Sequence, residues 1–215
     1  MTTPGATKPQ PTRGKRQRNR RGEGARLRAE LIEAAARLLE TSGDANALTL
    51  TAVAREAGIA TPSIYRHFPG RAQLVQAVVA DRFQRLDDAQ LEAMSGTIDP
   101  AAALWACCDA YCRFGLDHPG PYQVLFAATL GLDPARPGHR PGERVFGRLV
   151  DAIQACIDAD SARPGDAHLM AVNVWVALHG IVSLRTSRPH QAWPPVSTLI
   201  DAALAGQTGL GRATY

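Results

Sequence analysis

The side chains most suited to metal or redox chemistry are Cys107, Cys108 and Cys112, with His118 close behind them in the chain. Cys108 and Cys112 are four residues apart and would lie on one face of a helix. They could belong to a metal or redox sensor, or they could be small side chains that fill an apolar core, as free cysteines often do. Because no second pair of candidate ligands lies nearby, the sequence favours the interpretation of these cysteines as core side chains. We therefore expect no metal and no cofactor.

The sequence lacks the short motifs that mark common enzyme classes. It contains no G-x-S-x-G, no H-E-x-x-H, no phosphate-binding glycine loop and no paired Cys-x-x-Cys. His179, which precedes Gly180 in an apolar segment, is interpreted as a packed and hydrogen-bonded histidine rather than a ligand. We therefore expect a binding protein with no catalytic residues, and not an enzyme.

A segment beginning at Thr49, T-L-T-A-V-A-R-E-A-G-I-A-T-P-S-I-Y-R-H-F, has the pattern of two short helices joined by a tight turn. Thr49 or Thr51 is expected to cap the first helix, and Gly58 to end it in the left-handed conformation that glycine favours. Thr61 is expected to cap the second helix, with Pro62 at the first helical position, where its missing N–H costs nothing. The segment therefore predicts a helix–turn–helix unit.

The second of these helices is predicted to span seven residues, which are too few to be stable in isolation. Ile64 and Phe68 must then pack against the preceding helices. That packing turns outward the polar side chains of Thr61, Ser63, Arg66 and His67. An outward polar face on the second helix is the arrangement with which helix–turn–helix proteins read the major groove of DNA.

Positive charge is concentrated at the N-terminus of a chain whose net charge is only +4. Residues 1–28 hold nine Lys and Arg and one acidic residue, Glu23, whereas the remainder is net acidic. A basic segment of this kind favours a polyanionic partner, nucleic acid before membrane. Residues 1–22 are too polar to be buried and are expected to be disordered when free. They are interpreted either as an arm that contacts DNA or as a solvated tail.

The placement of proline and of apolar residues predicts an all-α fold with nine or ten helices, because proline interrupts helix interiors. We expect a disordered basic arm at 1–22, a three-helix DNA-binding domain at 23–70 and a larger helical domain at 71–215. The Pro/Gly-rich residues 132–142 are expected to form a loop between two helices. The proline-free blocks available to helices are 12–61, 70–99, 101–118, 122–133, 142–163 and 165–188.

The apolar stretch at 167–184 approaches the length of a membrane span but contains His168, Asn173, His179 and Ser183. It is interpreted as a buried helix of a soluble protein. The N-terminus has no apolar core typical of a secretory signal. We therefore expect a cytoplasmic protein with no membrane partner.

Residues 24–86 resemble the tetracycline-repressor (TetR/AcrR) regulators. The resemblance is carried by an amphipathic helix ending at Gly43, by L-T-x-V-A-x-x-A-G-I from Leu50, by S-I-Y-R-H-F-P from Ser63, and by Arg71 and Leu74. Arg71 stands where the family usually has a lysine that contacts phosphate, so a cation is retained. The resemblance implies that Tyr65 and His67 contact the DNA backbone and that Thr61, Pro62, Ser63 and Arg66 approach the bases. The full set of expected DNA-binding residues adds Thr49, Thr51, Arg71, Arg26 and Arg28.

The C-terminal part resembles one subtype of that family, through residues 118–126 and through a Trp–His–Gly signature at Trp175, His179 and Gly180. The resemblance implies a helical ligand-binding and dimerisation domain. Each expected pocket residue could instead fill the core; the set is Trp105, Cys108, Tyr111, Cys112, Tyr122, Phe126, Met170, Asn173, Trp175 and His179. The dimer is expected to form through helices 143–158 and 166–186, with Val145, Leu149, Ile153, Val174 and Ile181 in the interface.

These patterns and the resemblance together predict a homodimeric, sequence-specific transcriptional regulator. We expect it to be a repressor that a small, largely apolar effector releases from a near-palindromic double-stranded operator. Helix 70–94 would couple the two domains. The alternatives are an architectural or ligand-independent DNA-binding protein and, less favoured, the cysteine-based sensor.

Overall fold

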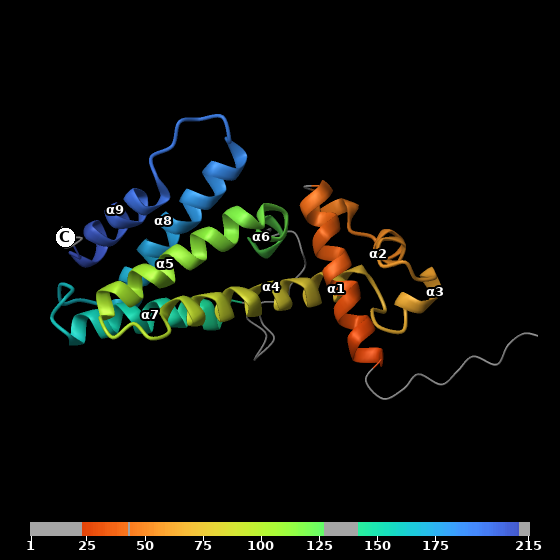
Figure 1. The fold of residues 1–215 in the computed structure, drawn as a ribbon, viewed down its shortest axis with the longest axis horizontal. Helices are drawn as coiled ribbons and strands as arrows, with labels where there is room; N and C mark the ends of the chain where they lie inside the picture. Colours follow the sequence, from red (N-terminus) through yellow and green to blue (C-terminus); the bar gives the residue numbers. More distant parts are fainter. Residues whose placement is uncertain (1–22, 43, 127–141, 211–215) are drawn as a thin grey trace, which may run out of the picture.

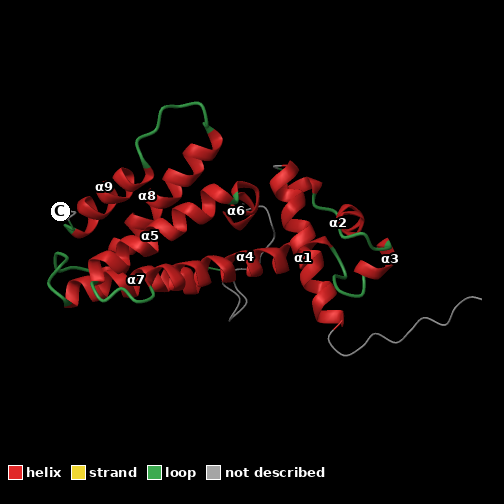
Figure 2. Ribbon diagram, viewed as in Figure 1, coloured by secondary structure: helices red, strands yellow, loops and turns green. Residues whose placement is uncertain are grey.

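The computed structural model describes residues 23–42, 44–126 and 142–210, in which helices are the only regular elements (Figure 2). The predicted all-α class is confirmed. The described residues contain nine α-helices and a short 3-10 helix at Ala45–Ala47, within the expected number. The predicted arm at 1–22, Gly43 and all of the predicted loop except its last residue lie outside the described residues. The helices are α1 (Glu23–Ser42), α2 (Leu50–Glu56), α3 (Thr61–Ile64), α4 (Arg71–Met94), α5 (Pro100–Asp117), α6 (Pro119–Phe126), α7 (Glu143–Asp158), α8 (Ala167–Ser187) and α9 (Val196–Thr208).

The first three helices pack into a small unit at one end of the molecule (Figure 1). Its core is made by Leu31 and Leu39 of α1, Val53 of α2, and Ile64 and Phe68, none of which is more than 1% exposed. These side chains recur at the helical spacing seen in the sequence, so each short helix is stabilised by burial rather than by its own length.

The long helix α4 connects this unit to the remaining helices and lies along the base of the bundle that they form (Figure 1). Its N-terminal part packs against α1, and its later turns pack against α5 and α7. Leu74, Val78 and Leu86 are fully buried along its inner face. One helix therefore belongs to both parts of the molecule.

Charged side chains fix α4 at both of these contacts. Near its middle, Arg82 is 3% exposed and donates to Glu33 of α1 at 2.7 Å, and Arg85 contacts the same carboxylate. One turn further on, the buried Asp87 pairs with Arg144 of α7 at 2.7 Å and with Arg148 at 2.5 Å. A buried ion pair is costly to break from one side because the remaining charge loses its partner. Displacement of α4 relative to either neighbour therefore disturbs a charged contact.

Helix α6 provides a second contact between the two parts of the molecule. Gly120 at its start lies directly against the backbone of α1, so a Cβ atom there would stand 2.3 Å from the Leu39 carbonyl oxygen. Nearby, His118 Nδ1 lies 3.1 Å from the Glu40 carboxylate. The end of α1 is thus held against α6 with no side chain between their backbones.

Helix α8 packs against α5, α7 and α9. Among the described helices it alone is long and apolar enough to cross a membrane, and 33% of its most apolar stretch is buried. The interpretation of 167–184 as a buried helix is therefore only partly right. Val174, Leu178 and Val182 face the core, whereas Leu169 and Val176 are 59% and 60% exposed.

Candidate functional site

The helix–turn–helix begins much as its sequence predicts. The Thr49 hydroxyl accepts a hydrogen bond from the Ala52 N–H at 3.1 Å and so caps α2, and Gly58 follows the helix with φ of +67°. The predicted cap of α3 is wrong. Ala60 is the N-cap and Thr61 is already helical, so no side chain caps this helix, and Pro62 occupies the second position. α3 spans four residues rather than seven.

The exposed face of α3 and of the turn after it forms the candidate DNA-reading surface. Pro62, Tyr65 and Arg66 are exposed, while Thr61, Ser63 and His67 are half-buried. Burial of Ile64 and Phe68 on the opposite side, as predicted, leaves these six side chains on the outer surface. The surface combines hydroxyl groups, an imidazole, a phenol and a guanidinium, which are donors suited to phosphate and base edges.

Four flanking residues of the predicted DNA-binding set also make contacts inside the unit. Arg71 Nε donates to the Leu48 carbonyl at 2.9 Å, which ties the start of α4 to the segment before α2. The Arg28 guanidinium lies 4.8 Å from the centre of the Phe68 ring, and Arg26 pairs with Glu30 along α1. The Thr49 hydroxyl caps α2, whereas Thr51 is exposed. These contacts support the shape of the reading surface.

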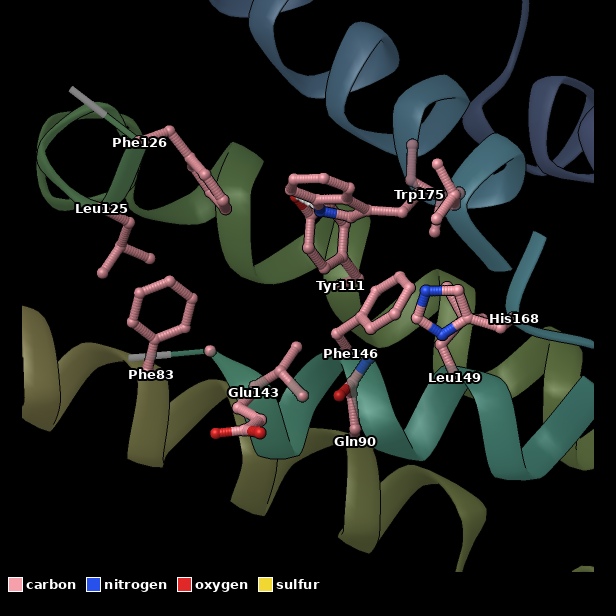
Figure 3. Close-up of a pocket in the computed structure, with 14 residues that line it drawn as sticks. Phe83, Gln90, Tyr111, Leu125, Phe126, Glu143, Phe146, Leu149, His168 and Trp175 are labelled. Carbon is pink, nitrogen blue, oxygen red and sulfur yellow. Dashed lines mark hydrogen bonds between the residues drawn. The ribbon is translucent and has the colours of Figure 1, made fainter. Parts of the chain in front are cut away.

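A second candidate site is a cavity of about 560 Å³ that is lined by α4, α5, α6, α7 and α8 and is open to solvent on one side, called here the main cavity (Figure 3). Of the predicted pocket residues, it brings together Tyr111, Phe126 and Trp175. Rings from five helices line this space, and such largely apolar, concave sites are typical of small-molecule binding. The lining residues are Phe83, Gln90, Tyr111, Leu125, Phe126, Gly142, Glu143, Val145, Phe146, Leu149, His168, Val172, Trp175 and Leu178.

Most of this wall was not predicted, because it comes from helices that the sequence does not place together. Phe83 and Gln90 of α4 are seven residues apart and lie on one helix face. The one sign of this wall in the sequence was Gln90, a polar residue on the apolar face of the helix predicted at 70–94. Phe146 and Leu149 come from α7, which had been assigned to the dimer interface alone.

Several predicted pocket residues do not line the main cavity. Cys108 and Cys112 are fully buried in the core. The Trp105 indole donates to Asp201 of α9 at 2.8 Å, and Asn173 is exposed and donates to the Leu169 carbonyl. Met170 is 7% exposed and lies outside the lining. Apart from the exposed Asn173, helical spacing identified buried or half-buried residues without distinguishing core from cavity.

The other two predicted pocket residues, Tyr122 and His179, line a smaller cavity of about 220 Å³ next to Phe126. A chain of hydrogen bonds joins the two cavities. The Trp175 N–H donates to the Tyr111 oxygen at 3.2 Å, the Tyr111 and Tyr122 hydroxyls are 2.9 Å apart, and the Tyr122 oxygen lies 2.7 Å from His179 Nδ1. His179 is hydrogen-bonded, as expected. These hydrogen bonds therefore connect Trp175 at one cavity with His179 at the other.

Burial favours the neutral forms of the three titratable side chains in this hydrogen-bond network, Tyr111, Tyr122 and His179. It raises the pKa of Tyr111 to about 12, raises that of Tyr122 further, and lowers the pKa of His179. A neutral His179 can accept from Tyr122 at Nδ1 and donate from Nε2 to the Ser183 hydroxyl at 3.3 Å. Protonation would remove the acceptor that Tyr122 faces.

The lowered pKa of His179 predicts that the folded protein loses stability at mildly acidic pH. The unfolded chain takes up a proton at His179 near pH 6.5, and the folded chain only at a lower pH. The stability from keeping His179 neutral is therefore fully present above about pH 6.5 and is lost as the pH falls through the folded pKa. Thermal unfolding between about pH 7 and pH 5 should show a smaller fall in Tm for His179→Asn than for the wild type. The exposed His190→Asn is the control, and superimposable pH profiles for His179→Asn and the wild type would contradict the prediction.

All four cysteines lie inside the described helices and are buried as free thiols. Burial raises the pKa of Cys107 and of Cys112 to about 12 and raises those of Cys108 and Cys156. A thiol that stays protonated is a poor metal ligand and a poor nucleophile. Among the described residues no group of three or more His, Cys, Asp or Glu side chains is placed to hold a metal ion.

The residues predicted for the dimer interface require correction. Val145, Leu149, Ile153 and Val174 are no more than 7% exposed, because they pack against other helices of the same chain. Ile153 and Val174 lie in the protomer core, and Val145 and Leu149 line the main cavity, so none of the four is on a surface that a second subunit could cover. Ile181 is partly exposed and packs at the edge of that core. The exposed apolar residues of α8 are Leu169, Val176 and Leu184.

Two family models match the chain. Residues 31–78 match the model described as bacterial regulatory proteins, tetR family, and residues 104–206 match the model described as a tetracyclin repressor-like C-terminal domain. The first match covers the helix–turn–helix and the start of α4. The second covers α5 to α9, and so every helix that lines the two cavities except α4.

Individual proteins match over most of their length. An uncharacterized HTH-type transcriptional regulator of Mycobacterium tuberculosis is 26% identical, covering 87% of this chain and 83% of that protein. The nucleoid occlusion factor SlmA of Vibrio cholerae is 31% identical, covering 70% of this chain and 76% of that protein. A solved structure of a protein of unknown function from Rhodococcus sp. RHA1 has a TM-score of 0.69 at 26% identity, covering 85% of this chain and 95% of that chain.

Proposed function

The chain belongs to the tetR family of bacterial regulatory proteins and is a DNA-binding transcriptional regulator; from this premise we propose that it is a homodimeric repressor controlled by a small molecule. Two copies bind a near-palindromic operator. A small, largely apolar effector enters the main cavity and favours a state with lower affinity for DNA. The protein acts in the cytoplasm, where its operator lies.

The observation that carries this proposal is the position of α4. Its first residue, Arg71, contacts the segment before α2, while Phe83 and Gln90 of the same helix line the main cavity. An effector that displaces the later turns of α4 therefore acts on the element that positions the helix–turn–helix. We place the DNA-binding domain at 23–70, with α4 as the coupling element of the domain at 71–215.

In the proposed complex the exposed face of α3 lies in the major groove. Thr61, Pro62, Ser63 and Arg66 approach base edges, and Tyr65 and His67 contact the backbone, as the family resemblance implies. Arg26, Arg28, Thr49, Thr51 and Arg71 flank this face and contribute phosphate contacts. Phosphate contacts set position, whereas base contacts set sequence preference.

The roles of Arg66 and Tyr65 can be separated by substitution. Arg66→Ala is expected to weaken binding to the preferred operator by about 1–3 kcal/mol and to relax the sequence preference at one position of each half-site, as loss of a bidentate guanine contact would. Tyr65→Phe is expected to weaken binding to all DNA sequences about equally. The measurement is binding to an operator selected from random duplexes by the wild type and to its single-base variants.

Arg113→Ala is the matched control, since it removes one exposed arginine from α5, in the other domain. It should leave both affinity and sequence preference unchanged. An unchanged order of operator variants with Arg66→Ala would remove this residue from the base-reading set.

The proposed dimer forms through the exposed side of α8, with Leu169, Val176 and Leu184 in contact with a second copy. Burial of this apolar face against a partner would remove from water the side chains that the protomer leaves exposed. A twofold axis through such an interface presents two α3 helices to half-sites about one helical turn, ~34–36 Å, apart. We assign the C-terminal domain to the Trp–His–Gly subtype on Trp175, His179 and Gly180.

The effector acts through its difference in affinity for the two states of the dimer, a coupling of typically about 1–3 kcal/mol. Rings around the main cavity favour a molecule with an apolar, ring-bearing body. Entry of such a molecule between α4 and α7 would act on the ion pairs of Asp87 with Arg144 and Arg148.

A second candidate is a DNA-binding protein that needs no effector, which the similarity to a nucleoid occlusion factor favours. The main cavity argues for the repressor, because a fixed architectural role does not require a largely apolar cavity of about 560 Å³ between the helices. Operator release by a compound that occupies this cavity would support the repressor. Operator binding that stays constant while the cavity is occupied would favour the architectural role.

A further inference from the structure

Gln90 stands out among the residues of the main cavity because it is polar and 2% exposed. The other strongly polar lining residues, Glu143 and His168, are exposed. Figure 3 shows the Gln90 side chain rising from α4 toward the cavity wall made by Phe146 of α7. A primary amide is thus buried beside an otherwise largely apolar space.

The contacts of Gln90 fix which end of its amide is unpaired. Its Nε2 donates to the Cys107 carbonyl of α5 at 3.3 Å. Because a carbonyl only accepts, the amide nitrogen must face Cys107, and Oε1 must be the other end. Oε1 is fully buried and has no hydrogen-bond partner. Leaving a buried acceptor unpaired is unfavourable, so this atom favours any ligand that can donate to it.

Among the buried polar groups of the described cavity wall, no other one is left to accept a hydrogen bond. The Tyr111 hydroxyl, which is buried at the same cavity, is already bonded to Trp175 and Tyr122. Elsewhere in the described part of the chain, the one other unpaired buried side-chain atom is Arg82 Nε, and Arg82 does not line the cavity.

We propose that Gln90 determines effector specificity, its Oε1 accepting a hydrogen bond from a hydroxyl or N–H group on an apolar, ring-bearing effector. This rests on the proposed function of the main cavity as an effector site. The apolar body packs against Phe83, Phe146 and Trp175, and a small rotation of the buried Gln90 side chain brings Oε1 to the donor at the side of α4. Molecules of the same shape without a donor leave Oε1 unpaired and bind more weakly.

The test compares two probes of nearly equal shape, 4-phenylphenol and 4-methylbiphenyl, by equilibrium dialysis against the full chain without DNA. The variants are Gln90→Met, which keeps side-chain length and removes the amide, and Gln76→Met as a matched control on the exposed side of α4. The ratio of the two dissociation constants should shift against the phenol by about 5- to 150-fold in Gln90→Met. The ratio for Gln76→Met should equal that of the wild type.

Retained binding of 4-methylbiphenyl shows that Gln90→Met keeps the cavity intact; if that variant fails to fold, Gln90→Leu replaces it in the comparison. An unchanged ratio in the folded variant would overturn the inference, as would failure of the wild type to bind either probe. Operator binding is measured separately with each probe. The expected shift in the ratio without any effect on operator binding would support the role of Gln90 and reject control by an effector.

Discussion

Val176→Glu is expected to convert the protein into a folded monomer that binds its operator at least about 100-fold more weakly. Val176 is 60% exposed on the outer side of α8, between the exposed Leu169 and Leu184. A carboxylate there costs the protomer little but would be desolvated and unpaired inside the proposed dimer, at several kcal/mol. Two α3 helices that are no longer joined lose the avidity of binding both half-sites together, which is worth about 10²–10⁴-fold.

Light scattering gives the mass of the variant, circular dichroism its helix content, and a gel-shift titration its operator affinity. Leu91→Glu is the matched control, because Leu91 is 55% exposed on α4 and the substitution adds the same charge. It should remain dimeric with unchanged affinity. A Val176→Glu protein that elutes as a dimer would show that the subunits associate through another surface.

Gly120→Ala is expected to destabilise the protein by about 1–3 kcal/mol or more, as overpacking of a rigid contact does. The added Cβ would stand 2.3 Å from the Leu39 carbonyl oxygen and 2.8 Å from the Glu40 nitrogen. Both atoms belong to the backbone of α1, so no side-chain rotation can relieve the overlap. The start of α6 and the end of α1 must separate, which lowers Tm and turns the helix–turn–helix relative to α4.

Thermal unfolding and operator affinity measure the two consequences. Gly147→Ala is the matched control, because a Cβ at Gly147 in α7 has open space around it. There the substitution should stabilise the helix by about 0.5–1 kcal/mol, since alanine loses less backbone entropy than glycine. Equal Tm values for Gly120→Ala and the wild type would mean that α1 and α6 can separate enough for the added methyl group at little cost in stability.

Local patterns predicted the DNA-binding unit because its elements are short and marked by their own residues. The cap at Thr49, the left-handed Gly58 and the burial of Ile64 and Phe68 follow from neighbours a few positions away. The start of α3 was misplaced by one residue. Thr61 is a good cap by residue type, but the helix begins with it and leaves Ala60 at the cap position.

Periodicity proved less informative in the C-terminal domain, where the same apolar stripe can face a core, a cavity or a partner. Val174 and Val176 are both valines of α8, yet one is fully buried and the other 60% exposed. Phe83 and Phe146 share a cavity wall only because α4 and α7 meet in space. Long-range packing of this kind does not affect the local spacing of apolar residues, so the lining of the main cavity could be identified only from the structure.

The burial of all four cysteines has a consequence for observing this protein in solution. Alkylating reagents attack thiolates, and thiols with raised pKa inside packed helices offer them almost none. A cysteine introduced at the exposed position 62 of α3 would therefore stand alone as a site for a spin label or fluorophore, with the native cysteines left in place. In a dimer the distance between the two labels would report the separation of the two α3 helices, and it would show how that separation changes as an effector binds.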